Sequence, residues 1–325
     1  MHAIDVSEWS FEGRFGDWTA DARYFEYTKA VNPIGAGLTP RIPIRHFPAE
    51  LHQGGPTRIV SLDLAGELGV DGPATSPGLL ASFVRIEAGE EVATAPNATS
   101  ELYYVFSGRG TSAVNGETVA WGEGDVLTLP AGSHSTHRAD VDTVLYWVHD
   151  EPLLRYLGVE ATVPRFRPTR YPAERSRAEL ARVAAAPRAA NRNRISVLLA
   201  NAEQPQSLTV THVLWAMLGL LPAGQMQPPH RHQSVALDLV IDCPPEGCYT
   251  LVGNRLDDDG RIVDPTRVDW RPGAAFVTPP GLWHAHHNES GQDAHLIPVQ
   301  DAGLHTYLRS LDIRFTTRVR MQIGG

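Results

Sequence analysis

Two stretches in the second half of the chain decide the fold. The first is Gly224–His232, GQMQPPHRH, and the second is 273–288, GAAFVTPPGLWHAHHN. Because side chains alternate along a β-strand, His230 and His232 are expected to point to the same face. His284 follows a Pro-x-Gly turn and can join them from a neighbouring strand. We therefore expect three imidazoles to converge on one metal ion and to leave its far side open for other ligands.

The rest of the chain consists mainly of short apolar stretches separated by Gly, Pro, Asn and Ser turns. This pattern favours an all-β fold made of antiparallel jelly-roll barrels joined by short helices. The layout of 80–86, 102–106, 126–129 and 144–148 returns in 213–218, 235–241, 249–252 and 274–277, which indicates an internal duplication. The predicted units are an aromatic-rich segment packing on the barrels or across a subunit boundary (1–78), a first barrel (79–160), a linker with one short helix within 175–188 (161–207) and a second barrel (208–325).

Composition limits the possible partners. The 325 residues include 42% hydrophobic and 20% charged residues with a formal charge of -9, which opposes binding to nucleic acid or to an anionic membrane surface. No apolar run reaches the length of a membrane-spanning helix, and no targeting segment is visible, so a cytoplasmic location is expected. Cys243 and Cys248 are expected to be reduced thiols.

The first half repeats the scaffold without its histidines. Gly89, Gly124, Pro130 and Gly132 keep the turn spacing, whereas the histidine positions hold Ala95, Asn97 and Ser135. Of the ligand-type side chains at these positions, Glu101 alone is kept. A displaced site that combines Glu101 with His134 and His137 is conceivable, but a structural, metal-free barrel is the preferred interpretation.

These spacings resemble the two motifs of the cupin superfamily, Gly-x5-His-x-His and Gly-x5-Pro-x-Gly-x2-His-x3-Asn. Both match in full, at Gly224–His232 and at Gly273–Asn288. The carboxylate that many cupins carry after the second histidine is missing, because Ala236 and Leu237 occupy its allowed positions. The resemblance therefore implies a bicupin, two double-stranded β-helix barrels, with one three-histidine site made by His230, His232 and His284.

Leu214-Trp215-Ala216 and Trp283-His284-x-His286 further resemble the metal-bearing half of the gentisate, salicylate and 1-hydroxy-2-naphthoate dioxygenases, although in that family the metal-bearing half comes first. The resemblance implies an Fe(II) enzyme that binds a small aromatic substrate and dioxygen and opens the ring beside the carboxyl group. It assigns His286 as a catalytic pocket histidine, Trp215 as an aromatic wall and Asp301 as the carboxylate that orients His286.

Two departures from this family concern the substrate. Gly219 occupies the position of a glutamine in the family. Asp238 occupies the position of an arginine that binds the substrate in the family. Replacing that cation by an anion disfavours a simple salicylate-like anion. Arg192 or Arg194 could supply a substitute cation. Otherwise the substrate could be neutral, amino-bearing or polyhydroxylated, with Asp238 accepting its hydrogen bond.

Two other functions remain open from the sequence. One is a different metal-dependent cupin enzyme, such as an isomerase, decarboxylase or hydroxylase, because an all-imidazole site also accepts other divalent transition metals. The other is a non-catalytic bicupin binding protein, which is disfavoured because one half keeps all three ligands and His286. The aromatic N-terminal segment also suggests a homo-oligomer.

Overall fold

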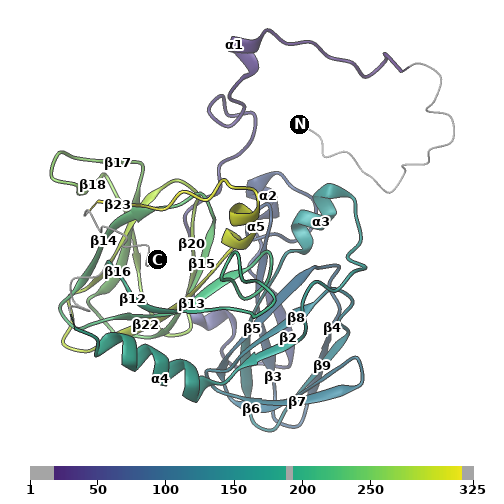
Figure 1. The fold of residues 1–325 in the computed structure, drawn as a ribbon, viewed down its shortest axis with the longest axis vertical. Helices are drawn as coiled ribbons and strands as arrows, with labels where there is room; N and C mark the ends of the chain where they lie inside the picture. Colours follow the sequence, from purple (N-terminus) through teal and green to yellow (C-terminus); the bar gives the residue numbers. More distant parts are fainter. Residues whose placement is uncertain (1–17, 188–192, 317–325) are drawn as a thin grey trace.

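The computed structural model describes residues 18–187 and 193–316 and contains two β-barrels that share one apolar core (Figure 1). Each barrel has one six-stranded antiparallel sheet, and the outer faces of these two sheets pack against each other. Leu102 and Tyr146 come from the first barrel, and Leu237 and Val299 from the second. Alternate residues of the same strands face the barrel interiors, so the central strands are buried on both sides.

The first barrel combines the six-stranded sheet with a four-stranded one, whose orders are β11-β8-β5-β10-β3-β2 and β4-β9-β6-β7. Its strands are β2 (Arg58–Ser61), β3 (Leu80–Ile86), β4 (Glu91–Thr94), β5 (Ser100–Ser107), β6 (Arg109–Val114), β7 (Glu117–Gly122), β8 (Val126–Pro130), β9 (Ser135–Ala139), β10 (Thr143–His149) and β11 (Thr169–Tyr171).

The second barrel repeats this plan with a six-stranded and a five-stranded sheet and a small hairpin. The six-stranded sheet contains β1 (Arg45–Phe47), β20 (Ala275–Thr278), β15 (Ala236–Asp242), β22 (Ala294–Gln300), β13 (Trp215–Leu221) and β12 (Ile195–Leu199). The five-stranded sheet contains β19 (Thr266–Asp269), β16 (Cys248–Gly253), β21 (Trp283–Asn288), β14 (Met226–Arg231) and β23 (Arg314–Phe315), and the hairpin β17 (Arg255–Leu256) and β18 (Ile262–Val263). The predicted all-β bicupin fold is confirmed.

The helices are short and lie outside the barrels. They are α1 (Tyr27–Ala30), the 3₁₀ turn η2 (Ala49–Leu51), α2 (Ala65–Leu68), α3 (Glu151–Leu157), α4 (Ala173–Ala184) and α5 (Ala302–Tyr307). The connector helix predicted within 175–188 is α4. It begins after Pro172 and packs Leu180 against Ile195 at the outer face of β12. Among the described helices, none is both long and apolar enough to cross a membrane.

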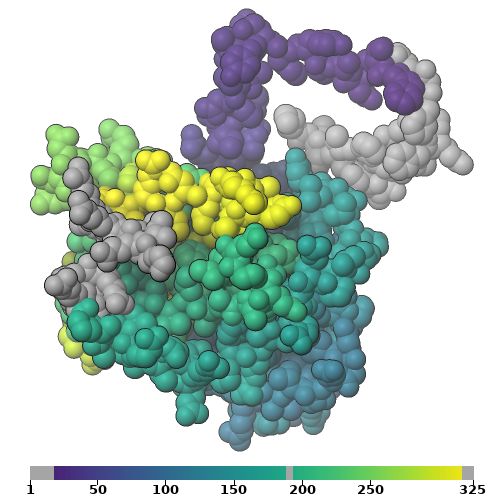
Figure 2. Space-filling view, in the orientation of Figure 1, coloured from purple at the N-terminus to yellow at the C-terminus, as the bar shows by residue number. Residues whose placement is uncertain are grey.

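Two parts of the N-terminal region are placed differently relative to the barrels. Residues 45–61 join both barrels, because β1 pairs with β20 of the second barrel and β2 pairs with β3 of the first. By contrast, the stretch around α1 extends away from the barrels in Figures 1 and 2, and Trp18 and Tyr24 are 87% and 93% exposed. The aromatic residues of this stretch therefore do not pack on a barrel, and packing across a subunit boundary, the other expected arrangement, stays a prediction. Trp9 and Phe11, which belong to the same prediction, lie outside the described residues.

Candidate metal centre

Strands β14 and β21 bring four imidazoles together inside the second barrel. His230 and His284 are direct partners across these antiparallel strands, and their ring centroids are 4.0 Å apart. His232 lies just beyond β14, with its ring centroid 4.9 Å from that of His284. His286 is two residues beyond His284 on the same strand face, and its ring centroid lies 5.8 Å from that of His230. All four side chains are buried.

Three of these rings are oriented by backbone carbonyl groups. Nδ1 of His230 lies 3.1 Å from the carbonyl oxygen of Pro228, Nδ1 of His232 lies 2.9 Å from that of Ser234, and Nδ1 of His284 lies 3.1 Å from that of Leu282. A carbonyl oxygen can only accept, so each Nδ1 carries the proton. Each Nε2 therefore keeps a lone pair for a metal ion, which is the usual way in which proteins prepare a histidine ligand.

His286 is held differently. A guanidinium nitrogen of Arg194 lies 3.3 Å from its Nε2 and can only donate, so Nδ1 carries the proton. That proton is donated to Oγ1 of Thr250 at 2.8 Å, and the same oxygen accepts the indole N–H of Trp270 at 2.8 Å. Both ring nitrogens of His286 thus have protein partners.

Distance and hydrogen bonding select different sets of three. His230, His284 and His286 each have one potential ligand atom within 4.8 Å of the others, which makes them the most compact set. The carbonyl contacts instead select His230, His232 and His284, the set that the sequence predicted. The cationic guanidinium of Arg194 faces Nε2 of His286 and opposes a metal ion there, whereas Nε2 of His230 has only the neutral amide of Gln227 beside it.

Burial keeps the cluster uncharged. It lowers the pKa of His230, His284 and His286 well below the ordinary value, and Arg194 and the neighbouring imidazoles add to this effect. The pKa of His232 is lowered to about 4, again mainly by burial. Neutral imidazole is the form that binds a metal, so the site needs no proton release before an ion enters.

Arg194 places a cation beside the same histidines. Its guanidinium contacts Sδ of Met217 at 3.2 Å, besides His286, and none of the described carboxylates lies within ion-pair distance of it. Burial lowers its pKa to about 10, which still leaves it charged. Of the two predicted substitute cations, the structure therefore places Arg194 beside the site, whereas Arg192 lies outside the described residues.

The two departures from the dioxygenase pattern both face the barrel interior. Leu237 and Leu239 pack in the core between the barrels, so Asp238 points inward. The hydroxyl of Thr278 donates to it at 3.1 Å, and burial raises its pKa to about 6. At Gly219, an added Cβ would lie 3.2 Å from Cδ2 of Leu296, so Leu296 crowds the place of a longer side chain.

The two remaining predicted residues, Trp215 and Asp301, lie in different surroundings. Trp215 begins β13 on the same interior face as Met217, and its role as an aromatic wall stays a prediction. Asp301 lies at the start of α5, where its carboxylate accepts the backbone N–H of Val235 at 2.9 Å. Thr250 rather than Asp301 orients His286, so the predicted role of Asp301 is replaced.

Sequence reasoning missed several residues of the site. Gln227 is buried on β14, with its amide nitrogen 3.3 Å from Nε2 of His230 and 3.1 Å from Oδ1 of Asn193. Phe315 on β23 stacks on His230, with ring centroids 6.1 Å apart. The position of Gln227, three residues before a predicted ligand, is a signal that could have been noticed, whereas Phe315 lies too far along the chain to be found by spacing.

In the first barrel, a chain of hydrogen bonds fills the corresponding interior. Ser112 contacts Nδ1 of His137 at 2.7 Å, Thr94 contacts its Nε2 at 3.0 Å, and the Tyr103 hydroxyl links Thr94 to the Glu101 carboxyl group. His134, by contrast, is exposed. The conceivable site made from Glu101, His134 and His137 is therefore not assembled.

Comparison with known proteins agrees with this architecture. Residues 82–149, in the first barrel, match the family model described as Cupin domain. The chain also superimposes on the crystal structure of a salicylate 1,2-dioxygenase from Pseudaminobacter salicylatoxidans with a TM-score of 0.68, at 15% identity, over 91% of this chain and 95% of that one. The fold and the histidine cluster define a bicupin.

Within the bicupins, the chain is similar in sequence to two curated dioxygenases. It is 36% identical over 88 residues to a 5-nitrosalicylic acid 1,2-dioxygenase of a Bradyrhizobium species, which is 26% of this chain and 42% of that protein. It is 42% identical over 62 residues to a 5-aminosalicylate 1,2-dioxygenase of a Comamonas species, which is 19% of this chain and 17% of that protein. The matched stretches thus span less than half of either relative. The chain has a bicupin fold and, over these stretches, resembles the salicylate-type 1,2-dioxygenases in sequence.

Proposed function

We propose that this bicupin is an Fe(II)-dependent dioxygenase that opens the ring of a hydroxylated or aminated aromatic carboxylate. The observation that carries the proposal is the set of three buried imidazoles whose Nδ1 atoms are fixed by carbonyl groups, which leaves the lone pairs on Nε2; that of His230 has the neutral amide of Gln227 beside it. This donor set fits a divalent transition metal. When bound, Fe(II) holds the substrate and dioxygen side by side and carries electrons between them.

The residues around the histidines suit an acidic aromatic substrate. The Arg194 guanidinium, which has no carboxylate within ion-pair distance among the described residues, binds the carboxylate group of the substrate. Asp238 faces the same interior and accepts a hydrogen bond from an amino or hydroxyl substituent. Trp215 and Met217 give the ring an apolar wall. An aminosalicylate-type substrate satisfies all of these groups at once.

His286 handles the proton in this proposal. Its Nε2 faces Arg194, and the hydroxyl of Thr250 fixes its Nδ1. When the substrate carboxylate pairs with Arg194, Nε2 of His286 becomes free to accept the proton of the ring hydroxyl group. Both atoms of dioxygen enter the product as the bond between the carboxyl-bearing and hydroxyl-bearing carbons breaks, which gives an oxo-dicarboxylic acid without a further reductant.

The test combines oxygen uptake with metal analysis. Protein reconstituted with Fe(II) is expected to consume dioxygen with 5-aminosalicylate, and His230→Ala is expected to abolish both iron binding and uptake. His232→Ala is expected to lose iron, whereas His286→Ala keeps iron and loses turnover. His295→Ala, on the same barrel but bonded to Asp242, is the matched control. Uptake that persists in His230→Ala would refute the proposal, and substrate turnover under nitrogen would indicate an isomerase or decarboxylase instead.

We also propose that the chain forms a homo-oligomer through the stretch around α1. Tyr24, Phe25 and Tyr27 are 93%, 77% and 74% exposed, which is unusual for neighbouring aromatic side chains. A second copy of the chain would cover them. Light scattering after gel filtration is expected to show a larger assembly for the full chain than for a variant with all three replaced by serine, and equal masses would contradict the proposal.

A further inference from the structure

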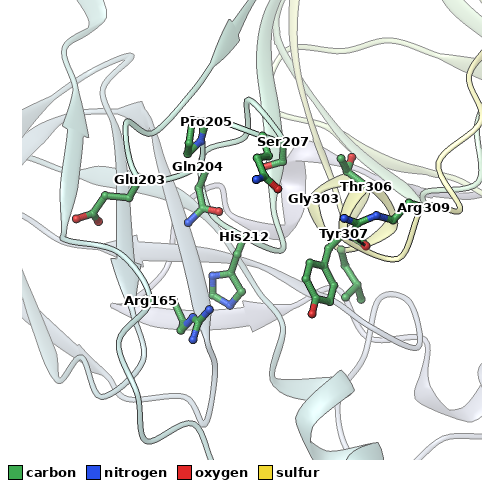
Figure 3. A pocket seen from close by; sticks show the side chains of 12 residues that line it. Arg165, Glu203, Gln204, Pro205, Ser207, His212, Gly303, Thr306, Tyr307 and Arg309 are labelled. Carbon is green, nitrogen blue, oxygen red and sulfur yellow. Dashed lines mark hydrogen bonds between the residues drawn. The ribbon is translucent and has the colours of Figure 1, made fainter.

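A second pocket lies between residues 203–212 and helix α5, at the junction of the barrels. Its volume is about 760 Å³. Its lining contains none of the four clustered histidines, so it is distinct from the metal centre. Figure 3 shows Arg165 and His212 on one side of it and Tyr307 and Arg309 on the other. We call this space the junction pocket.

Two arginines give the junction pocket a positive charge. In the described part of the chain, neither Arg165 nor Arg309 has a carboxylate within ion-pair distance. The one acidic residue of the lining, Glu203, is already bound to Arg167, at 3.4 Å from its guanidinium and 2.8 Å from its backbone N–H. The charge of Glu203 is therefore balanced, and those of the two arginines are not.

The positions of these arginines are not equivalent. Arg309 has a left-handed backbone with a φ of 58°, and its guanidinium lies 5.6 Å from the ring centroid of Tyr307. It also donates to the carbonyl oxygen of Tyr307. Arg165 lies beside His212 on the opposite side (Figure 3). The two arginines thus bring positive charge to two sides of the pocket.

His212 supplies an unused polar atom between them. Its Nδ1 is buried and has no hydrogen-bond partner. Burial and the nearby Arg165 lower its pKa, so the ring is neutral and can donate one hydrogen bond or accept one. Leu304 and Tyr307 add apolar surface to the lining.

We propose that the junction pocket is a binding site for a small organic dicarboxylate, with one carboxylate group on Arg165 and the other on Arg309. The carbon chain lies along Leu304 and Tyr307. The oxo-dicarboxylic acid formed by the proposed reaction has this chemistry, and for that source the inference rests on the proposed function. Binding itself depends on neither the metal nor the reaction.

Calorimetry with the full chain tests the site, with cis,cis-muconate as the dicarboxylate probe. Arg165→Gln and Arg309→Gln are each expected to weaken its binding at least about tenfold, because each removes a charge-assisted contact. Arg261→Gln, in the loop between β17 and β18, is the control and is expected to bind like the unmodified chain. Sorbate, which has the same carbon chain with one carboxylate, is expected to bind more weakly than muconate.

The outcomes separate this proposal from the proposed function. Muconate binding is expected to be unchanged in His230→Ala, even if the chain has no dioxygenase activity. Muconate that binds at Arg194 would still bind in Arg165→Gln and Arg309→Gln. The measured quantity is therefore the one bound muconate per chain that these two substitutions remove. Competition by the ring-opened product would identify the source as the reaction of the protein itself, and its absence would indicate another dicarboxylate. No binding of muconate, equal binding in all variants, or equally tight binding of inorganic phosphate would overturn the proposal.

Discussion

Replacing Glu101 by glutamine should stabilise the protein increasingly as the pH rises. Glu101 is buried in the first barrel, where the Tyr103 hydroxyl donates to it at 2.6 Å and the Trp147 indole at 3.0 Å. Burial raises its pKa from 4.5 to about 8, although these two hydrogen bonds oppose the shift. The folded protein therefore holds a proton on Glu101 at neutral pH that the unfolded chain has already released.

The sign and size follow from this difference in protonation. For a raised pKa, the contribution to stability is complete below the unfolded value of 4.5 and is lost as the pH rises to about 8. The loss is about 1.4 kcal/mol per pH unit, or about 5 kcal/mol in total. Glutamine keeps an oxygen for Tyr103 and Trp147 and has no proton to lose. Glu101→Gln is thus expected to gain stability over the parent by several kcal/mol near pH 8 and by little near pH 5.

Urea unfolding followed by tryptophan fluorescence, repeated between about pH 5 and pH 8, measures this difference. Glu91→Gln, at an exposed position of the same barrel, is the matched control and is expected to give a difference that does not change with pH. If the two variants show the same pH dependence, then Glu101 is ionised in the folded protein and the reasoning fails. Such a result would also mean that the interior of the first barrel is open to water or holds a cation.

Three further predictions concern packing, substrate choice and acid stability. Gly110→Ala is expected to lower the free energy of unfolding by about 3 kcal/mol, because the added Cβ would lie 2.1 Å from the Arg138 carbonyl oxygen. At Gly122 an added Cβ meets nothing within 4 Å, so Gly122→Ala should cost about 1 kcal/mol or less. Thermal unfolding of the two variants measures the difference. Asp238→Asn is expected to reduce kcat/KM for 5-aminosalicylate relative to salicylate about tenfold, and an unchanged ratio would remove Asp238 from substrate binding. Burial lowers the pKa of His137 to about 4 and that of His149 to about 3. The free energy of unfolding should therefore fall as the pH drops below the usual histidine range, and it should fall less steeply in His149→Phe. Identical slopes in the two proteins would contradict this prediction.

The sequence contained most of the fold because the strand and turn signals are local. The stretch 80–86 forms β3 without a change of boundary, and the apolar runs of the second half lie in the corresponding strands. The helix predicted within 175–188 begins two residues earlier, after Pro172. The sequence left two partners open for the N-terminal aromatic residues, a barrel or another subunit, for a physical reason. Hydrophobic composition says that a segment needs a partner, but it does not say which surface or which molecule provides it.

The sequence by itself determined the candidate ligands, because a strand period of two and a Pro-x-Gly turn fix the directions of His230, His232 and His284. Only the tertiary structure decided what surrounds them. In the structure, Arg194 contacts His286 and Phe315 of β23 stacks on His230. The carboxylate of Asp301 accepts a hydrogen bond from the backbone of Val235 and does not orient His286. These contacts join residues that lie far apart in the chain, and spacing carries no information about such pairs because the packing of the sheets alone determines which strands become neighbours.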